Sequence, residues 1–127
     1  MKELKLKVII NRSSKEVFDF VLNPNNTPIW IDSIVHEETD KWPVKVGGTY
    51  RNQNKEKTWS SYKVIAFQKD KMFEFLKDDN NYHVRYTLTD KSNSSCELEY
   101  YEWVKKGDLD DPFTIDILYK LKNILEK

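Results

Sequence analysis

Apolar and polar residues alternate along most of this chain, which is the pattern of strands that bury one face. In the first such segment Leu4, Leu6, Val8 and Ile10 share one face. Further strand-like segments follow at residues 33–38, 49–52, 58–67, 72–77, 82–89 and 96–105. Short polar turns separate most of these segments. Because strands joined by short turns pair antiparallel, the pattern predicts an antiparallel meander.

Helical signals occur at two places between and after these strands. Ser13 and Glu16 have the spacing of a capping box and predict a short helix, and a second short helical turn is expected near Trp30. Asp111 as cap and Pro112 as first residue predict a long final helix. Its apolar stripe consists of Ile117, Leu118, Leu121, Ile124 and Leu125. We therefore expect one α+β domain over residues 1–127, with a curved sheet around the C-terminal helix and a pocket between them.

Strand parity predicts which side chains face that pocket. The expected inward set contains the tyrosines Tyr50, Tyr62, Tyr86 and Tyr100, together with Asn52, Val64, Ala66, Phe73 and Phe75. His83 and Arg85 fall on the outward face, where we expect solvent. A buried tyrosine needs a partner for its hydroxyl, which a ligand or a pocket water can supply. The alternative is that these rings only fill the core.

Glu102 is the sharpest candidate for chemistry. Continued parity along the last strand puts its carboxylate inside, where it must be protonated or held by a partner such as a tyrosine. A carboxyl with a raised pKa is suited to general acid or base catalysis. We favour instead a β-bulge at Tyr100 and Tyr101 that turns Trp103 inward and Glu102 outward, because glutamate is seldom fully buried.

Composition narrows the classes of function. Lysine plus arginine and aspartate plus glutamate both number 21, so the chain lacks the basic excess of a nucleic-acid binder. No segment reads as a membrane span, and a single cysteine fits a reducing cytoplasm. The run His36, Glu37, Glu38 begins like a zinc-protease motif but lacks the second histidine four residues on. We therefore expect neither a metal nor a cofactor.

Four segments, taken in order, carry a resemblance to a known family. Residues 13–21 form a capped opening helix, and residues 23–30 have the pattern N-P-x-x-x-P-x-W. Residues 46–51 have the pattern V-G-x-x-Y-R, and residues 62–75 form an aromatic hairpin. In these segments the chain resembles the helix-grip superfamily of START domains, birch-pollen allergens and bacterial polyketide cyclase/dehydrase-like (SRPBCC) proteins. The resemblance implies a seven-stranded antiparallel sheet gripping the terminal helix around a cavity. Only about sixteen residues remain from Pro112, which favours a smaller or more open pocket than in many members.

These observations predict a protein that binds a small apolar or aromatic molecule between sheet and helix. The proposed contacts are Trp30, Tyr50, Tyr62, Tyr86, Tyr100, Ile117 and Leu121. Trp30 and Trp42 are expected near the pocket mouth. An enzyme of cyclase, dehydratase or isomerase type, using Glu102 with Tyr62 or Tyr100, is one alternative. A protein-binding module that uses Trp42, Tyr101 or Trp103 is another, and a homodimer stays open.

Overall fold

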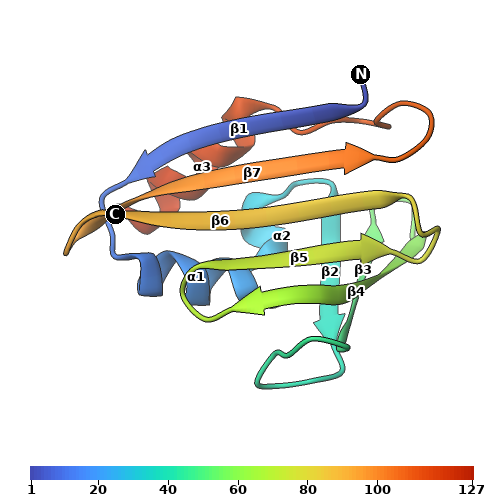
Figure 1. The fold of residues 1–127 in the computed structure, drawn as a ribbon, viewed down its shortest axis with the longest axis horizontal. Helices are drawn as coiled ribbons and strands as arrows, with labels where there is room; N and C mark the ends of the chain where they lie inside the picture. The colour runs from blue at the N-terminus through green and yellow to red at the C-terminus, as the bar shows by residue number, and fades with distance from the viewer.

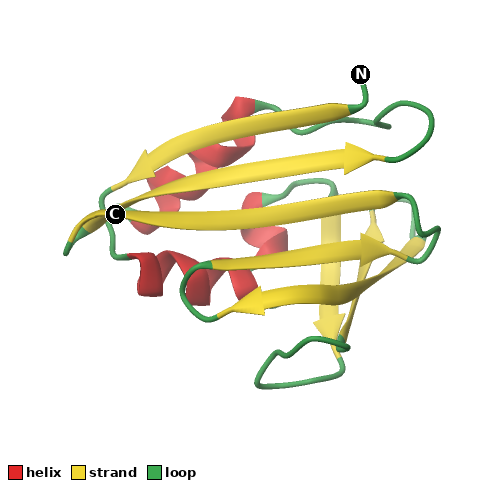
Figure 2. Ribbon diagram, in the orientation of Figure 1, coloured by secondary structure: helices red, strands yellow, loops and turns green.

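The computed structural model describes residues 1–127, which form a curved seven-stranded antiparallel sheet with three helices on one side of it (Figures 1 and 2). The strands are β1 (Glu3–Ile10), β2 (Ile34–Thr39), β3 (Thr49–Asn54), β4 (Trp59–Gln68), β5 (Met72–Lys77), β6 (Tyr82–Ser92) and β7 (Ser95–Val104). The helices are α1 (Ser14–Leu22), α2 (Thr27–Trp30) and α3 (Ile115–Leu125). The predicted α+β helix-grip architecture is confirmed.

The sheet consists of a continuous meander to which the first strand is added at the end. Its order is β1-β7-β6-β5-β4-β3-β2, so β1 lies beside β7 although most of the chain separates them. In this pairing Leu6 lies opposite Tyr100. Each neighbour from β2 to β7 is also the next strand in sequence, as short polar turns require. The short turns thus account for the order from β2 to β7, whereas β1 joins the sheet through a long-range pairing.

The first two helices follow their sequence signals. Ser13 caps α1, and its side-chain oxygen accepts a hydrogen bond from the Glu16 backbone N–H at 3.2 Å. Val17 and Phe18 on this helix are completely buried against the sheet. Asn23 and Pro24 then separate α1 from the single turn of α2, which packs beside β2. None of the three helices has both the length and the hydropathy that a membrane span needs.

The final helix starts later than predicted. It begins at Ile115 with Thr114 as its cap, whereas Asp111 has φ of +54° and so takes the left-handed conformation. Residues 105–114 therefore form an irregular connection with bends, and only eleven residues are helical. Leu118 and Leu121 are fully buried, and α3 lies against β1 at one side of the sheet (Figure 1). The helix α1 contacts β6 and β7, and α2 contacts β2 at the far edge of the sheet.

Two irregularities change the facing of side chains within strands. The register of β4 against β5 shifts between Val64 and Ala66, so that Phe67 instead of Ala66 faces the core. The ring of Phe67 meets that of Phe18 edge-on, with 5.6 Å between the ring centroids. The predicted inward position of Ala66 is therefore wrong by one residue, because strict parity fails across a bulge. A second shift occurs in β2, between Ile34 and His36.

Candidate functional site: an aromatic cavity beneath the second helix

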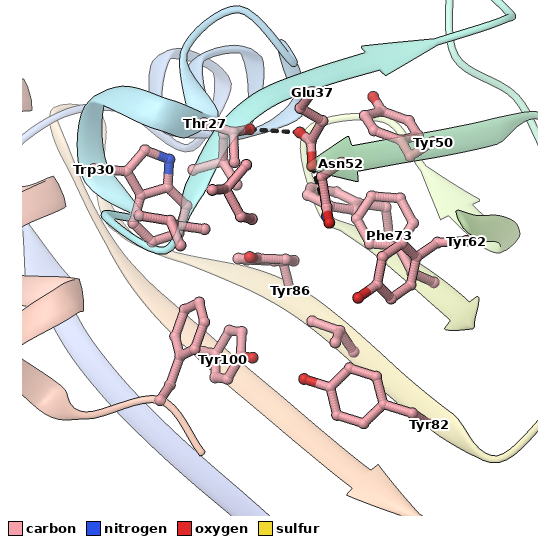
Figure 3. A pocket seen from close by; sticks show the side chains of 16 residues that line it. Thr27, Trp30, Glu37, Tyr50, Asn52, Tyr62, Phe73, Tyr82, Tyr86 and Tyr100 are labelled. Carbon is pink, nitrogen blue, oxygen red and sulfur yellow. Dashed lines mark hydrogen bonds between the residues drawn. The ribbon is translucent and has the colours of Figure 1, made fainter. Parts of the chain in front are cut away.

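A cavity of about 90 Å³ lies between α2 and the inner face of the sheet (Figure 3). Sixteen residues line it, and thirteen of them are hydrophobic if the tyrosines are counted as such. The other three are Thr27, Glu37 and Asn52. The aromatic lining residues are Trp30, Tyr50, Tyr62, Phe73, Phe75, Tyr82, Tyr86, Tyr100 and Phe113. A space of this size holds several waters or a small organic molecule, and it is well below the roughly 300–1,000 Å³ of drug-sized sites.

The five aromatic residues that the sequence analysis proposed as contacts all line this cavity. These are Trp30, Tyr50, Tyr62, Tyr86 and Tyr100. Direct cross-strand pairing explains their grouping, since Tyr50 lies opposite Tyr62 and Tyr86 lies opposite Tyr100. Trp30 completes the wall from α2, with its ring edge-on to that of Tyr86 at 6.3 Å between centroids.

The two residues proposed from the final helix lie elsewhere. Leu121 is fully buried in the core, and Ile117 borders a separate surface depression. No residue of α3 lines the cavity, because the helix begins only at Ile115 and packs beside β1. Phe113, in the irregular connection, takes the place we expected for the helix and stacks on Tyr100 with 4.1 Å between centroids. Trp42 lies in the loop between β2 and β3, is 62% exposed and does not line the cavity.

Glu37 is the charged member of the lining, and the sequence analysis missed it. The bulge at the start of β2 turns this residue inward and pairs it with Asn52 on β3. Its carboxylate accepts hydrogen bonds from Thr27 Oγ1 at 2.5 Å and from Asn52 Nδ2 at 3.4 Å (Figure 3). One turn of α2 and two strands thus converge on a single carboxylate.

Burial dominates the titration of the groups around Glu37. Removal from water raises the pKa of Glu37 to about 7, although the hydrogen bonds from Thr27 and Asn52 act in the opposite direction. Burial, and then the nearby Glu37 charge, raise the pKa of Tyr62 to about 12. The same two causes raise the pKa of Tyr50 further. Near neutral pH the tyrosines therefore stay protonated while Glu37 can gain or lose a proton.

Glu102 faces inward as parity predicts, and the bulge that we favoured is absent. The register of β7 is continuous with both neighbours across Tyr100 and Tyr101. The Glu102 side chain is 1% exposed, and its two oxygens accept hydrogen bonds from the Tyr82 hydroxyl at 2.8 Å and the Phe113 backbone N–H at 2.9 Å. Those two donors explain how a glutamate is buried here. The residue does not line the cavity, so its proposed catalytic role stays a prediction without geometric support.

The expectation that His83 is solvated is wrong. It lies on the outward face as predicted, yet it is only 7% exposed because Trp103 stacks on its ring at 4.6 Å. Its Nδ1 lies 3.0 Å from a carboxylate oxygen of Glu74, and Arg85 donates to the other oxygen of that carboxylate at 2.8 Å. The ring of Tyr101 stacks on the ring of Trp103 and so joins this outer cluster. The outer face therefore carries its own packed layer, separated from the cavity by the sheet.

Several solved structures share this fold at low sequence identity. A START superfamily protein from Mycobacterium smegmatis aligns with 99% of this chain and 90% of its own, with a TM-score of 0.68 and 10% identity. DynU16, from the dynemicin biosynthetic locus, aligns with 99% of this chain and 48% of its own, with a TM-score of 0.70 and 15% identity. The Aha1 dimer from Colwellia psychrerythraea aligns with 99% and 97%, with a TM-score of 0.68 and 13% identity.

No family model and no curated protein matches the sequence. Identities of this size show a common fold and leave the individual function to be argued from the site. The predicted helix-grip fold therefore agrees with the solved structures on both arrangement and extent.

Proposed function

We propose that this chain, which has the fold of START-type helix-grip proteins, binds a small apolar or aromatic molecule in the cavity beneath α2. The observation that supports the proposal is the cavity itself, in which thirteen of sixteen lining residues are hydrophobic. Apolar cavities with a few convergent polar groups are the usual form of small-molecule sites. The START-type neighbour and the dynemicin-locus neighbour have the same fold, which fits this use.

The dimensions of the cavity restrict its occupant. A volume of about 90 Å³ is smaller than an engineered cavity of roughly 150 Å³ that accommodates benzene. A sterol or a long acyl chain does not fit without movement of Trp30 or Phe113. Their rings meet edge-on at 6.3 Å between centroids, and both residues also border the neighbouring surface depression. We therefore propose a compact ligand, or the small end of a longer one that extends past this pair.

A thermal-shift and calorimetric titration tests the proposal. Phenol, indole and benzyl alcohol serve as small aromatic probes; each is larger than benzene and would extend past Trp30 and Phe113 toward the neighbouring depression. Glucose serves as a polar compound that the cavity should reject. A ligand at a hundred times its dissociation constant adds about 2.7 kcal/mol, which raises the midpoint of a domain of this size by roughly 2–8 °C. Absence of any shift with all three aromatic probes would contradict the proposal.

Two pocket variants and one control locate the binding. Tyr62→Ala removes a wall of the cavity, and Val84→Phe fills the cavity while leaving the surrounding rings in place. Both should weaken aromatic binding by about tenfold or more, because each alters contacts that the ligand makes. Tyr119→Ala changes an exposed tyrosine on α3 that lies outside the cavity, so it should bind like the original protein. Equal losses in all three variants would place the binding elsewhere.

A further inference from the structure

We infer that the preferred ligand of this cavity is a small organic cation, an ammonium group on an apolar body that pairs with the carboxylate of Glu37. This inference rests on the proposed binding function and specifies the chemical class of the ligand. Its basis is the charge inventory of the lining, the use already made of its donors, and the charge of the surface beside it.

Glu37 is the only charged residue among the sixteen that line the cavity, which contains no lysine, arginine or histidine. An anionic ligand such as a fatty acid or a phenolate would therefore find no counter-charge and would meet the Glu37 carboxylate. An ammonium group finds its counter-charge in place. Charge-assisted hydrogen bonds in a partly buried site are also stronger than neutral ones.

Four donor groups of the cavity are engaged within the protein, whereas the indole N–H of Trp30 has no hydrogen-bond partner. Thr27 and Asn52 both donate to Glu37. Tyr50 donates to the carbonyl oxygen of Leu22 at 2.7 Å, and Tyr82 donates to Glu102. Each carboxylate oxygen of Glu37 accepts only one hydrogen bond and keeps a further lone pair. The Glu37 carboxylate therefore keeps acceptor capacity for a ligand that donates.

Aromatic rings line the cavity that the carboxylate borders and add to this preference. Tyr50 lies beside the Glu37 side chain, and Tyr62 and Tyr86 lie farther across the cavity from it (Figure 3). The faces of aromatic rings attract cations, and aromatic cages are a known way to bind organic ammonium groups. A carboxylate beside several rings therefore offers an ammonium group both kinds of contact at once.

The surface next to the cavity has the same sign of charge. A depression that shares Trp30 and Phe113 with the cavity carries Asp32, Asp111 and Asp116 against one cation, Lys120. Lys120 is already paired with Asp32 at 2.5 Å. Clefts lined by one sign of charge concentrate ligands of the opposite sign. The approach to Trp30 and Phe113 thus favours cations as well.

A matched series of compounds tests the inference on the complete chain. n-Butylamine, 1-butanol and butyrate have nearly the same size and carry a charge of plus one, zero and minus one, and benzylamine, benzyl alcohol and benzoate repeat the comparison on a ring. Calorimetry at pH 8 should show each amine binding at least about tenfold more tightly than its alcohol, with the acid weakest. Equal binding of amine and alcohol would overturn the inference and leave the proposed function intact.

Glu37→Gln and Glu38→Gln form the matched pair of variants. Glu38 is the next residue on β2, points outward and pairs with Arg51 at 2.9 Å. Glu37→Gln should lower amine affinity to that of the alcohol, which itself changes little, whereas Glu38→Gln should bind all compounds like the original protein. An amine preference that survives Glu37→Gln would also overturn the inference. Failure of every compound to bind would contradict the proposed function itself.

The pH dependence of the unmodified protein gives an answer that needs no variant. The titratable groups around Glu37 are His36 on the same strand, Tyr50 on β3, Tyr62 on β4 and Tyr86 on β6. With the pKa of Glu37 at about 7, the ionised fraction rises about tenfold between pH 6 and pH 8. Amine affinity should rise by the same factor while alcohol affinity stays constant. A flat profile for the amine would contradict the role of Glu37.

Discussion

Glu37 and Glu102 are two inward glutamates in the same half-barrel, yet their surroundings differ in kind. Glu102 is 1% exposed and holds two short hydrogen bonds, one from Tyr82 on β6 and one from the backbone of Phe113. Glu37 is half-buried, borders the cavity, and one of its two hydrogen bonds is long at 3.4 Å. A carboxylate whose two oxygens are both well hydrogen-bonded holds parts of the chain together. A carboxylate with free acceptor capacity beside a cavity is instead available to a ligand.

The largest expected effect on stability comes from removing the Glu102 carboxylate. Glu102→Ala leaves the Tyr82 hydroxyl and the Phe113 N–H without acceptors and opens a void, so the free energy of unfolding should fall by about 3 kcal/mol. Urea denaturation measures the change. Glu102→Gln keeps the shape and one acceptor, so it should cost less than half as much. A loss below about 1 kcal/mol for the alanine variant would show that Glu102 does not hold the connection before α3.

Glu37 should have an opposite and pH-dependent effect on stability. Its pKa rises on folding from the ordinary 4.5 to about 7, so the folded state binds more protons than the unfolded state between these values. The contribution of Glu37 to stability is therefore full below pH 4.5 and lost as pH rises through 7, by about 1–3 kcal/mol for a half-buried group. Glu37→Gln should abolish this decline in denaturation curves measured from pH 5 to 8. A parallel decline in both proteins would assign it to other groups.

The smallest expected effect comes from the hydrogen bond that Thr27 gives to Glu37. Thr27→Val removes a donor to the carboxylate and leaves the packing of α2 nearly unchanged, so the ionised form loses about 1 kcal/mol of stabilisation. The pKa of Glu37 should then rise from about 7 toward about 8, which NMR titration of the side-chain carboxyl carbon can follow. An unchanged or lower pKa would mean that Thr27 does not support the charged carboxylate.

Strand parity predicts the regular part of the site from the sequence alone. Tyr50, Tyr62, Tyr86 and Tyr100 lie on stretches where alternation is unbroken, and all of them reach the cavity. Parity also predicts the inward position of Glu102, whereas the rarity of fully buried glutamate favours an outward one. The two donors that make the burial possible are remote in sequence. The average burial of a residue type predicts the facing of Glu102 less well than parity does, because it ignores hydrogen-bond partners.

The irregular part of the site was not predictable in the same way. Glu37 faces inward only because β2 shifts its register after Ile34, and nothing in the sequence specifies that shift. His83 is buried on the outer face by Trp103, a contact across two strands that parity alone does not describe. The start of α3 moved because Asp111 turns the chain in the left-handed conformation instead of capping it. Bulges, cross-strand stacking and turn geometry are tertiary features, which one-strand patterns do not encode.

The position of Trp30 has an optical consequence. Of the four tryptophans, Trp30 alone lines the cavity, is 1% exposed and has a buried indole N–H without a hydrogen-bond partner. Trp42 and Trp59 are exposed, at 62% and 41%. The fluorescence of Trp30 should therefore emit at shorter wavelength than that of these two and respond to whatever enters beside it. Ligand binding in the cavity can therefore be followed by the intrinsic fluorescence of Trp30, without any added label.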